Sequence, residues 1–181
     1  RRGHRRGRRT VAAERGVRVV SSPEGNRNAV AEQALGMLLA LANHSLRSDR
    51  EVRQNVWRRE ANRGWELMGR TIGIIGCGHT GGQFARKLAG MEMEVLAFDK
   101  YKPAGYAAEM PWVQESNLEE IQRRADIISL HLPLTPETKH LVDADFIKKC
   151  KPGWVLLNTS RGACVKTSDL VAALENGTIS G

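Results

Sequence analysis

A glycine-rich segment, Gly76-Cys77-Gly78-His79-Thr80-Gly81, constrains the fold of this 181-residue chain more than any other feature. It follows an apolar run typical of a β-strand, Thr71–Ile75, and opens a run typical of a helix, 83–89. An acidic residue, Asp99, ends a second apolar run about 20 residues further on. A bare G-x-G-x-x-G motif is a weak signal, but this strand–turn–helix context predicts a dinucleotide-binding site.

Each glycine of the motif has its own physical reason. Gly76 permits a tight turn out of the strand, Gly78 lets the backbone approach a pyrophosphate closely, and Gly81 lets the helix pack against the strand. The first N–H groups of the helix then face the phosphates with a partial positive charge. The alternative is a glycine turn that holds no ligand.

Asp99 predicts which dinucleotide is bound. Its carboxylate is placed to accept hydrogen bonds from the adenosine ribose hydroxyls, and its negative charge repels a 2′-phosphate, so NAD is favoured over NADP. Lys100 and Lys102 follow closely in sequence and soften this preference.

Strand-type and helix-type patterns alternate from Thr71 onward, which predicts an α/β fold with a parallel, doubly wound sheet of Rossmann type. A start of a further strand at 178–181 predicts that the sheet is incomplete on its C-terminal side. The expected strands are 71–75, 95–98, 126–131 and 154–158, and the expected helices are 80–91, 118–124, 143–150 and 167–175.

Before this sheet the pattern predicts a short strand at 16–20 and a helix from Asn28 to about Ser45. The apolar face of that helix is expected to comprise Val30, Ala34, Met37, Leu38 and Leu41. Residues 47–66 suggest a second helix and an arm, in which tryptophans lie beside arginines. Such tryptophans indicate either a subunit contact or a solvated helix with two half-buried rings.

The net charge of +8 is concentrated at the start of the chain, because residues 1–18 hold eight arginines and one acid. We therefore divide the chain into a basic arm, 1–13, and a near-neutral domain, 14–181. The arm is expected to be either disordered or the product of a shifted reading frame, since arginine and glycine codons become Gly, Ala, Val, Asp or Glu codons when read one base later. Nucleic-acid binding is the least favoured alternative, because the arm offers no aromatic residue for base stacking.

Composition narrows the class further. The longest apolar run, 34–42, has nine residues and predicts a buried helix and no membrane partner. The three cysteines are widely spaced, which predicts neither a disulfide framework nor a metal site and favours a reducing, cytoplasmic location.

The chain resembles the nucleotide-binding domain of the D-isomer-specific 2-hydroxyacid dehydrogenases, nearest to the members that act on 3-phosphoglycerate in serine biosynthesis. The resemblance covers residues 14–181 and implies an NAD-dependent oxidoreductase that transfers hydride between the cofactor and a small D-2-hydroxy or 2-keto acid. It also implies a homodimer formed through residues 30–66. The matching segments are 30–32, 72–82, Asp99, 131–135 and 157–162.

The resemblance implies residue roles as well. His79 and Thr80 would join Gly76, Gly78 and Gly81 around the pyrophosphate, and Asp99 would hold the ribose. The adenosine side would be lined by Leu132, Pro133 and Thr138, and the nicotinamide side by Thr159, Ser160 and Arg161. Arg161 would be the catalytic arginine, whose planar fork holds the substrate carboxylate.

The resemblance further implies a histidine that accepts the hydroxyl proton, supported by a carboxylate, both beyond Gly181. His131 is expected to line the cofactor site instead of serving as this base. The 181-residue chain alone is therefore expected to bind NAD weakly and to be inactive. Two other functions stay open: an NAD-sensing corepressor-like binding protein and a catalytically inactive fragment.

Overall fold

A five-stranded parallel sheet organises the chain, in the order β3-β2-β1-β4-β5. The computed structural model describes residues 10–20, 22 and 24–181. From β1 the chain builds the sheet outward through β2 and β3 on one side, and then through β4 and β5 on the other side. The ends of β1, β2 and β4 therefore meet at a switch point, where open α/β sheets bind ligands. The strands are β1 (Thr71–Ile75), β2 (Glu94–Phe98), β3 (Gln114–Glu115), β4 (Ile127–Leu130) and β5 (Val155–Asn158).

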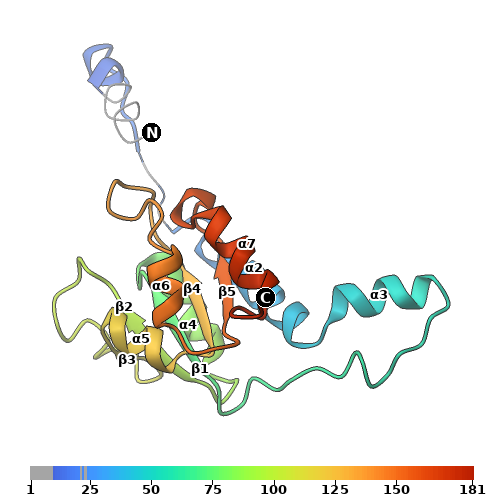
Figure 1. The fold of residues 1–181 in the computed structure, drawn as a ribbon. Coiled ribbons are helices and arrows are strands. Elements are labelled where there is room, and N and C mark those ends of the chain that lie inside the picture. Colours follow the sequence, from blue (N-terminus) through green and yellow to red (C-terminus); the bar gives the residue numbers. More distant parts are fainter. Residues whose placement is uncertain (1–9, 21, 23) are drawn as a thin grey trace.

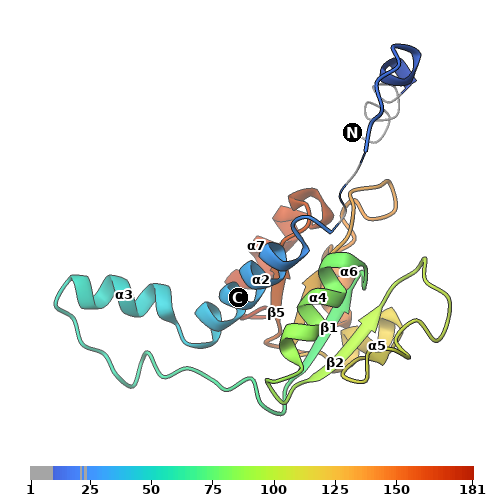
Figure 2. The same ribbon diagram turned by 180° about the vertical axis from the view of Figure 1, so that it is seen from behind.

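Helices cover both faces of the sheet (Figures 1 and 2). The helices α2 (Arg27–Ala42) and α4 (His79–Leu88) share one buried core with the strands. A second core, on the other face, includes residues of α5 (Leu118–Arg124), α6 (Ala144–Lys149) and α7 (Thr167–Glu175). This arrangement confirms the predicted Rossmann-type doubly wound fold.

Alternation along the strands assigns side chains to these two cores. In β1, Ile72 and Ile74 pack toward α2 and α4, whereas Ile75 belongs to the core beneath α5 and α6. Residues on both faces are fully buried, as expected for a parallel sheet covered on both sides.

The buried stripe of α2 differs from the predicted one. It comprises Ala31, Ala34, Leu38 and Ala42, so Ala34 and Leu38 were predicted correctly, whereas Met37 and Leu41 are only partly buried. The reason is steric, since three alanines allow α2 to lie closer to α4 than larger side chains would.

Most other element bounds agree with the sequence prediction, and α5 and α7 agree at both ends. The predicted strand at 16–20 is wrong: these residues pair with no described strand, and Val20 is 76% exposed. The two-residue strand β3 is absent from the expected strands and was missed. At the end of the chain, Ile179 forms only an isolated parallel bridge to Trp154.

An arm extends from the end of α2 (Figures 1 and 2). The helix α3 (Ser45–Arg53) projects from the body, has no buried residue, and is followed by a long segment that returns to β1. The return is fixed where Trp65 N donates to Ala42 O at 3.0 Å. Trp65 is half-buried, but Trp57 lies outside any helix and is 79% exposed, so the interpretation as two half-buried rings on a helix is wrong for Trp57.

Residues 10–14 are helical, and 10–20 stand apart from the body (Figure 1). The predictions for residues 1–9 of the basic arm lie outside the described residues. Across the described ranges, each helix is too short or too polar to cross a membrane. The same ranges hold no cluster of three or more His, Cys, Asp or Glu side chains that could bind a metal ion.

Candidate functional site

The turn after β1 is wedged between the ends of its two neighbouring strands. Gly76 has a φ of +95°, and its N–H donates to Phe98 O of β2 at 2.8 Å. A Cβ on Gly76 would lie 2.6 Å from His131 O, just beyond β4. Both the left-handed backbone and this close approach require glycine at position 76.

The first turn of α4 is open toward solvent. Its N-cap residue, Gly78, has no side chain that could accept a hydrogen bond. The first amides of the helix, beginning with that of His79, therefore have no side-chain cap. A Cβ added to Gly78 would meet no heavy atom within 4 Å. The structure therefore offers a cradle of N–H groups with room beside it, which suits a phosphate anion.

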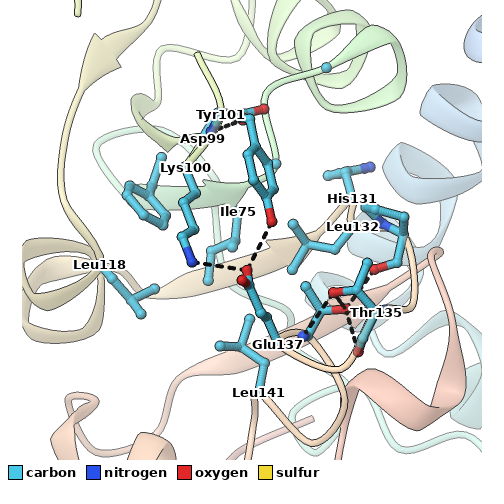
Figure 3. A pocket seen from close by; sticks show the side chains of 15 residues that line it. Ile75, Asp99, Lys100, Tyr101, Leu118, His131, Leu132, Thr135, Glu137 and Leu141 are labelled. Carbon is cyan, nitrogen blue, oxygen red and sulfur yellow. Dashed lines mark hydrogen bonds and ion pairs between the residues drawn. The ribbon is translucent and has the colours of Figure 1, made fainter. Parts of the chain in front are cut away.

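A pocket of about 390 Å³ lies beside this turn, between the ends of β1 and β2 and the loop that follows β4 (Figure 3). Its volume and its mainly apolar walls suit a nucleoside. Six of the sequence-predicted site residues line it: Gly76, Gly78, Asp99, Leu132, Pro133 and Thr138.

Asp99 and Thr138, which both line the pocket, are each held in place by hydrogen bonds. Asp99 Oδ1 accepts a hydrogen bond from Tyr101 N at 3.0 Å, which orients the carboxylate at the end of β2. Thr138 Oγ1 donates to Pro133 O at 2.6 Å and accepts from Thr135 N at 2.8 Å. The loop after β4 is thus braced by its own side chains.

An ion pair and a hydrogen bond cross the rim of the pocket (Figure 3). Lys100 Nζ lies 2.9 Å from Glu137 Oε2, and the Tyr101 hydroxyl donates to the same oxygen at 2.8 Å. The ion pair raises the pKa of Lys100 and lowers that of Glu137, mainly through their hydrogen bond. The role of Glu137 at this rim was missed, because a contact across 37 positions leaves no local pattern in the sequence.

His131 also lines the pocket but is not available as a base. Burial lowers the pKa of His131 to about 4, so the ring is neutral at pH 7. Its Nε2 lies 2.9 Å from Ser129 Oγ, and the ring lies 5.5 Å from the Phe84 ring. The geometry is that of a residue in the pocket wall.

Thr159, Ser160 and Arg161 form a second group, at the end of β5. The Asn158 side chain shapes this loop, because its Oδ1 accepts from Ser160 N at 3.0 Å and from Ser160 Oγ at 2.7 Å, while its Nδ2 donates to Arg161 O at 3.0 Å. Asn158 was missed as a shaping residue, although its position directly before the loop was a usable signal. The side chain of Arg161 is exposed and donates from Nη1 to Ser160 O at 2.5 Å.

The residues present fit a bound dinucleotide. Thr159 Oγ1 is buried and has no hydrogen-bond partner among the described residues, so a ligand beside β5 could satisfy it. The β5 group does not line the pocket. His79, Thr80 and Gly81 do not line it either, but they lie beside it at the start of α4. One end of the site is thus a pocket sized for a nucleoside, its middle is a helix N-terminus, and its far end is an exposed arginine.

A parallel sheet with this turn at its switch point and an acid at the end of β2 defines a dinucleotide-binding domain. The family model described as "D-isomer specific 2-hydroxyacid dehydrogenase, NAD binding domain" matches residues 35–181. The chain therefore belongs to this family as its NAD-binding domain, which confirms the predicted family and cofactor.

Curated relatives support the same assignment. The D-3-phosphoglycerate dehydrogenase of Mycobacterium tuberculosis is 36% identical over 167 residues, which cover 92% of this chain and 31% of the relative. The hydroxypyruvate reductase of Thermotoga maritima is 33% identical over 168 residues, covering 93% of this chain and 54% of the relative. The chain thus spans about a third to a half of these proteins.

Solved structures agree with the fold. The apo-structure of D-lactate dehydrogenase from Escherichia coli matches with a TM-score of 0.82 and 38% identity, over 93% of this chain and 52% of that one. The D-lactate dehydrogenase of Aquifex aeolicus, complexed with NAD and lactic acid, matches with a TM-score of 0.82 and 31% identity, over 95% and 51%. Relatives with different substrates therefore share this domain.

Proposed function

We propose that this domain serves an NAD-dependent oxidoreductase that transfers hydride between NAD and a D-2-hydroxy acid. The observation that carries the proposal is the order of three features along the carboxyl edge of the sheet: the Asp99 pocket after β2, the uncapped start of α4 after β1, and Arg161 after β5. These three features match the three parts of the cofactor and substrate in order: adenosine, pyrophosphate, and the reacting end.

The chain holds the cofactor through residues of complementary chemistry. The backbone N–H groups at His79, Thr80 and Gly81 bind the pyrophosphate, with Gly76 and Gly78 leaving it space. Asp99 accepts the ribose hydroxyls. The adenosine packs against Leu132, Pro133 and Thr138, and the nicotinamide lies beside Thr159 and Ser160.

Arg161 is the catalytic residue that this chain supplies. The hydroxyl proton that leaves with the hydride would go to a base outside these 181 residues, the histidine that the family resemblance implies. When bound, NAD supplies the acceptor or donor of the hydride. The guanidinium of Arg161 binds the carboxylate of the 2-hydroxy acid and fixes the orientation of the reacting carbon. The Asn158 hydrogen bonds hold the backbone from which this arginine projects.

We propose 3-phosphoglycerate as the first substrate to test, with serine biosynthesis as the setting. Support comes from the 36% identity to D-3-phosphoglycerate dehydrogenases across 92% of this chain. Because the hydroxypyruvate reductase and the D-lactate dehydrogenases match this domain with similar identity, hydroxypyruvate and D-lactate belong in the same assay. The domain's three buried, unpaired cysteines suit the reducing cytoplasm.

We further propose a homodimer formed through residues 30–66. The arm exposes Leu46, Val52 and Trp57, with exposed fractions of 73%, 53% and 79%. Large apolar side chains gathered on a projecting element are typical of an interface with a partner.

The sharpest test of the cofactor site compares two glycines with equal space around them. Neither Gly78 nor Gly90 has a heavy atom within 4 Å of an added Cβ, so Gly78→Ala and Gly90→Ala should both fold. We expect Gly78→Ala to weaken NAD binding at least about tenfold, because its methyl group occupies the space of the pyrophosphate. Gly90→Ala should bind like the unmodified chain in isothermal titration calorimetry.

Equal NAD affinity in the two variants would contradict this placement of the cofactor. The reaction itself is tested in the gene product that carries this chain, by following NADH formation with 3-phosphoglycerate, D-lactate and D-glycerate, the last of which is the reduced form of hydroxypyruvate. If the protein turns over none of these acids, the proposed reaction is contradicted, whereas the proposed cofactor site is not.

A further inference from the structure

The two lysines beside Asp99 are both engaged by other side chains. Lys102 Nζ lies over the Tyr106 ring, 5.1 Å from its centroid. Lys100 Nζ pairs with Glu137 Oε2 at 2.9 Å. The sequence alone suggested that these cations weaken the preference for NAD, but in the structure Lys100 is paired with a carboxylate and Lys102 lies over an aromatic ring.

Glu137 makes two polar contacts at the exposed rim of the pocket. Its Oε2 accepts from both Lys100 Nζ and the Tyr101 hydroxyl, so one carboxylate oxygen ties the loop after β4 to the loop after β2 (Figure 3). The ion pair lowers the pKa of Glu137 and raises that of Lys100, so both groups are charged at neutral pH.

The charge balance of the pocket follows from this pair. Among the described residues that line it, Asp99, Lys100 and Glu137 are the charged ones at neutral pH, and they sum to one negative charge. A 2′-phosphate would meet two carboxylates and a lysine that is already neutralised. Without Glu137, the same phosphate would meet one carboxylate and an unpaired lysine.

We propose that Glu137 is a specificity-determining residue, which excludes 2′-phosphorylated cofactor by pairing with Lys100 across the adenosine pocket. The inference rests on the proposed cofactor placement and extends it to a residue outside the glycine motif and Asp99. It predicts that NAD selection is shared by two carboxylates on different loops.

The test measures Kd for NAD and for NADP by isothermal titration calorimetry with the 181-residue chain. Glu137→Gln keeps the shape of the side chain and removes its charge, and should raise the affinity for NADP relative to NAD about five- to tenfold. The gain should shrink with added salt, because it is electrostatic. The matched control is Glu120→Gln, since Glu120 also accepts from one cation and one hydroxyl, Arg124 and Ser116, but lies outside the pocket.

A second variant isolates the lysine. In Glu137→Gln/Lys100→Met, the ratio of NADP to NAD affinity should return close to that of the unmodified chain, because the freed cation is gone. An unchanged ratio in Glu137→Gln, or a gain that persists without Lys100, would overturn the inference although NAD still binds. An unmodified chain that binds neither cofactor would overturn the site itself, and this inference with it.

Discussion

Gly81, in the first turn of α4, lies directly against the carbonyl of Gly76 in the turn that precedes the helix. A Cβ on Gly81 would overlap Gly76 O and would lie 3.2 Å from Ile74 Cγ2 of β1. The third glycine of the motif is thus required by helix–strand packing, whereas Gly78 has free space beside it. One motif therefore combines a structural requirement and a ligand requirement at positions three residues apart.

Gly81→Ala should destabilise the domain by about 1–3 kcal/mol, because the backbone carbonyl of Gly76 has no room to yield. Gly82→Ala is the matched control, since its Cβ would make only ordinary contacts at 3.9 Å. That variant should be as stable as the unmodified chain or gain up to about 1 kcal/mol from helix propensity. Urea unfolding of both variants measures the difference, and equal midpoints would refute the packing argument.

The fold was predictable because its signals are local. The glycine turn, the alternation of strand and helix patterns, and the ends of α5 and α7 all depend on neighbouring residues; Asn117, for example, accepts from Glu120 N at 2.8 Å and caps α5. Residues 16–20 have the composition of a strand. A strand also needs a neighbouring strand with which to pair, and none of the described strands lies beside this segment. The stripe of α2 was misplaced because its close approach to α4 is decided in three dimensions.

In the site, too, the features that depend on neighbouring residues were predictable and those that depend on distant contacts were not. Gly76, Gly78 and Asp99 follow from backbone geometry and from position at a strand end, and these three residues line one pocket in the structure. The pairing of Glu137 with Lys100 and Tyr101 depends on two loops meeting across 36 to 37 positions. No periodicity or spacing carries that information.

His131 predicts a pH-dependent stability. Its pKa is about 4 in the folded domain, against an ordinary value of 6.5, so the unfolded chain binds the proton more readily. The resulting stability is present above pH 6.5 and is lost as the pH falls toward 4, by as much as about 3 kcal/mol. Urea unfolding at about pH 7 and about pH 5 should therefore differ by roughly 2 kcal/mol from this residue.

A paired substitution isolates this effect. Ser129→Ala/His131→Phe removes both hydrogen-bonding partners, keeps a ring against Phe84, and should flatten the pH dependence. The control, His140→Asn, changes an exposed histidine at a left-handed position that asparagine tolerates, and should leave the slope unchanged. A slope that survives the paired substitution would assign the titration to another group.

Arg161 predicts a kinetic signature. In the gene product that carries this chain, Arg161→Lys should lower kcat/KM about 10²- to 10³-fold, because a lysine cannot hold the substrate carboxylate in a two-point fork. NAD affinity should fall far less than kcat/KM, since the proposed contact is to the substrate. Arg123→Lys, at an exposed position on α5, serves as the control. An equal loss of NAD binding and turnover would assign Arg161 to the cofactor instead.

Trp57 predicts the oligomeric state. The unmodified chain should elute in light-scattering chromatography with twice its 20.1 kDa mass. Trp57→Asp should convert it to a monomer at micromolar concentration, because losing a buried tryptophan at an interface costs about 2 kcal/mol or more and the new carboxylate adds a desolvation cost. Val171→Asp, at an exposed valine on α7, should remain dimeric. An unmodified chain of monomeric mass would contradict the proposed dimer. A Trp57→Asp variant that stays dimeric would exclude the arm as the interface, because Trp57 is the largest exposed apolar group of the arm.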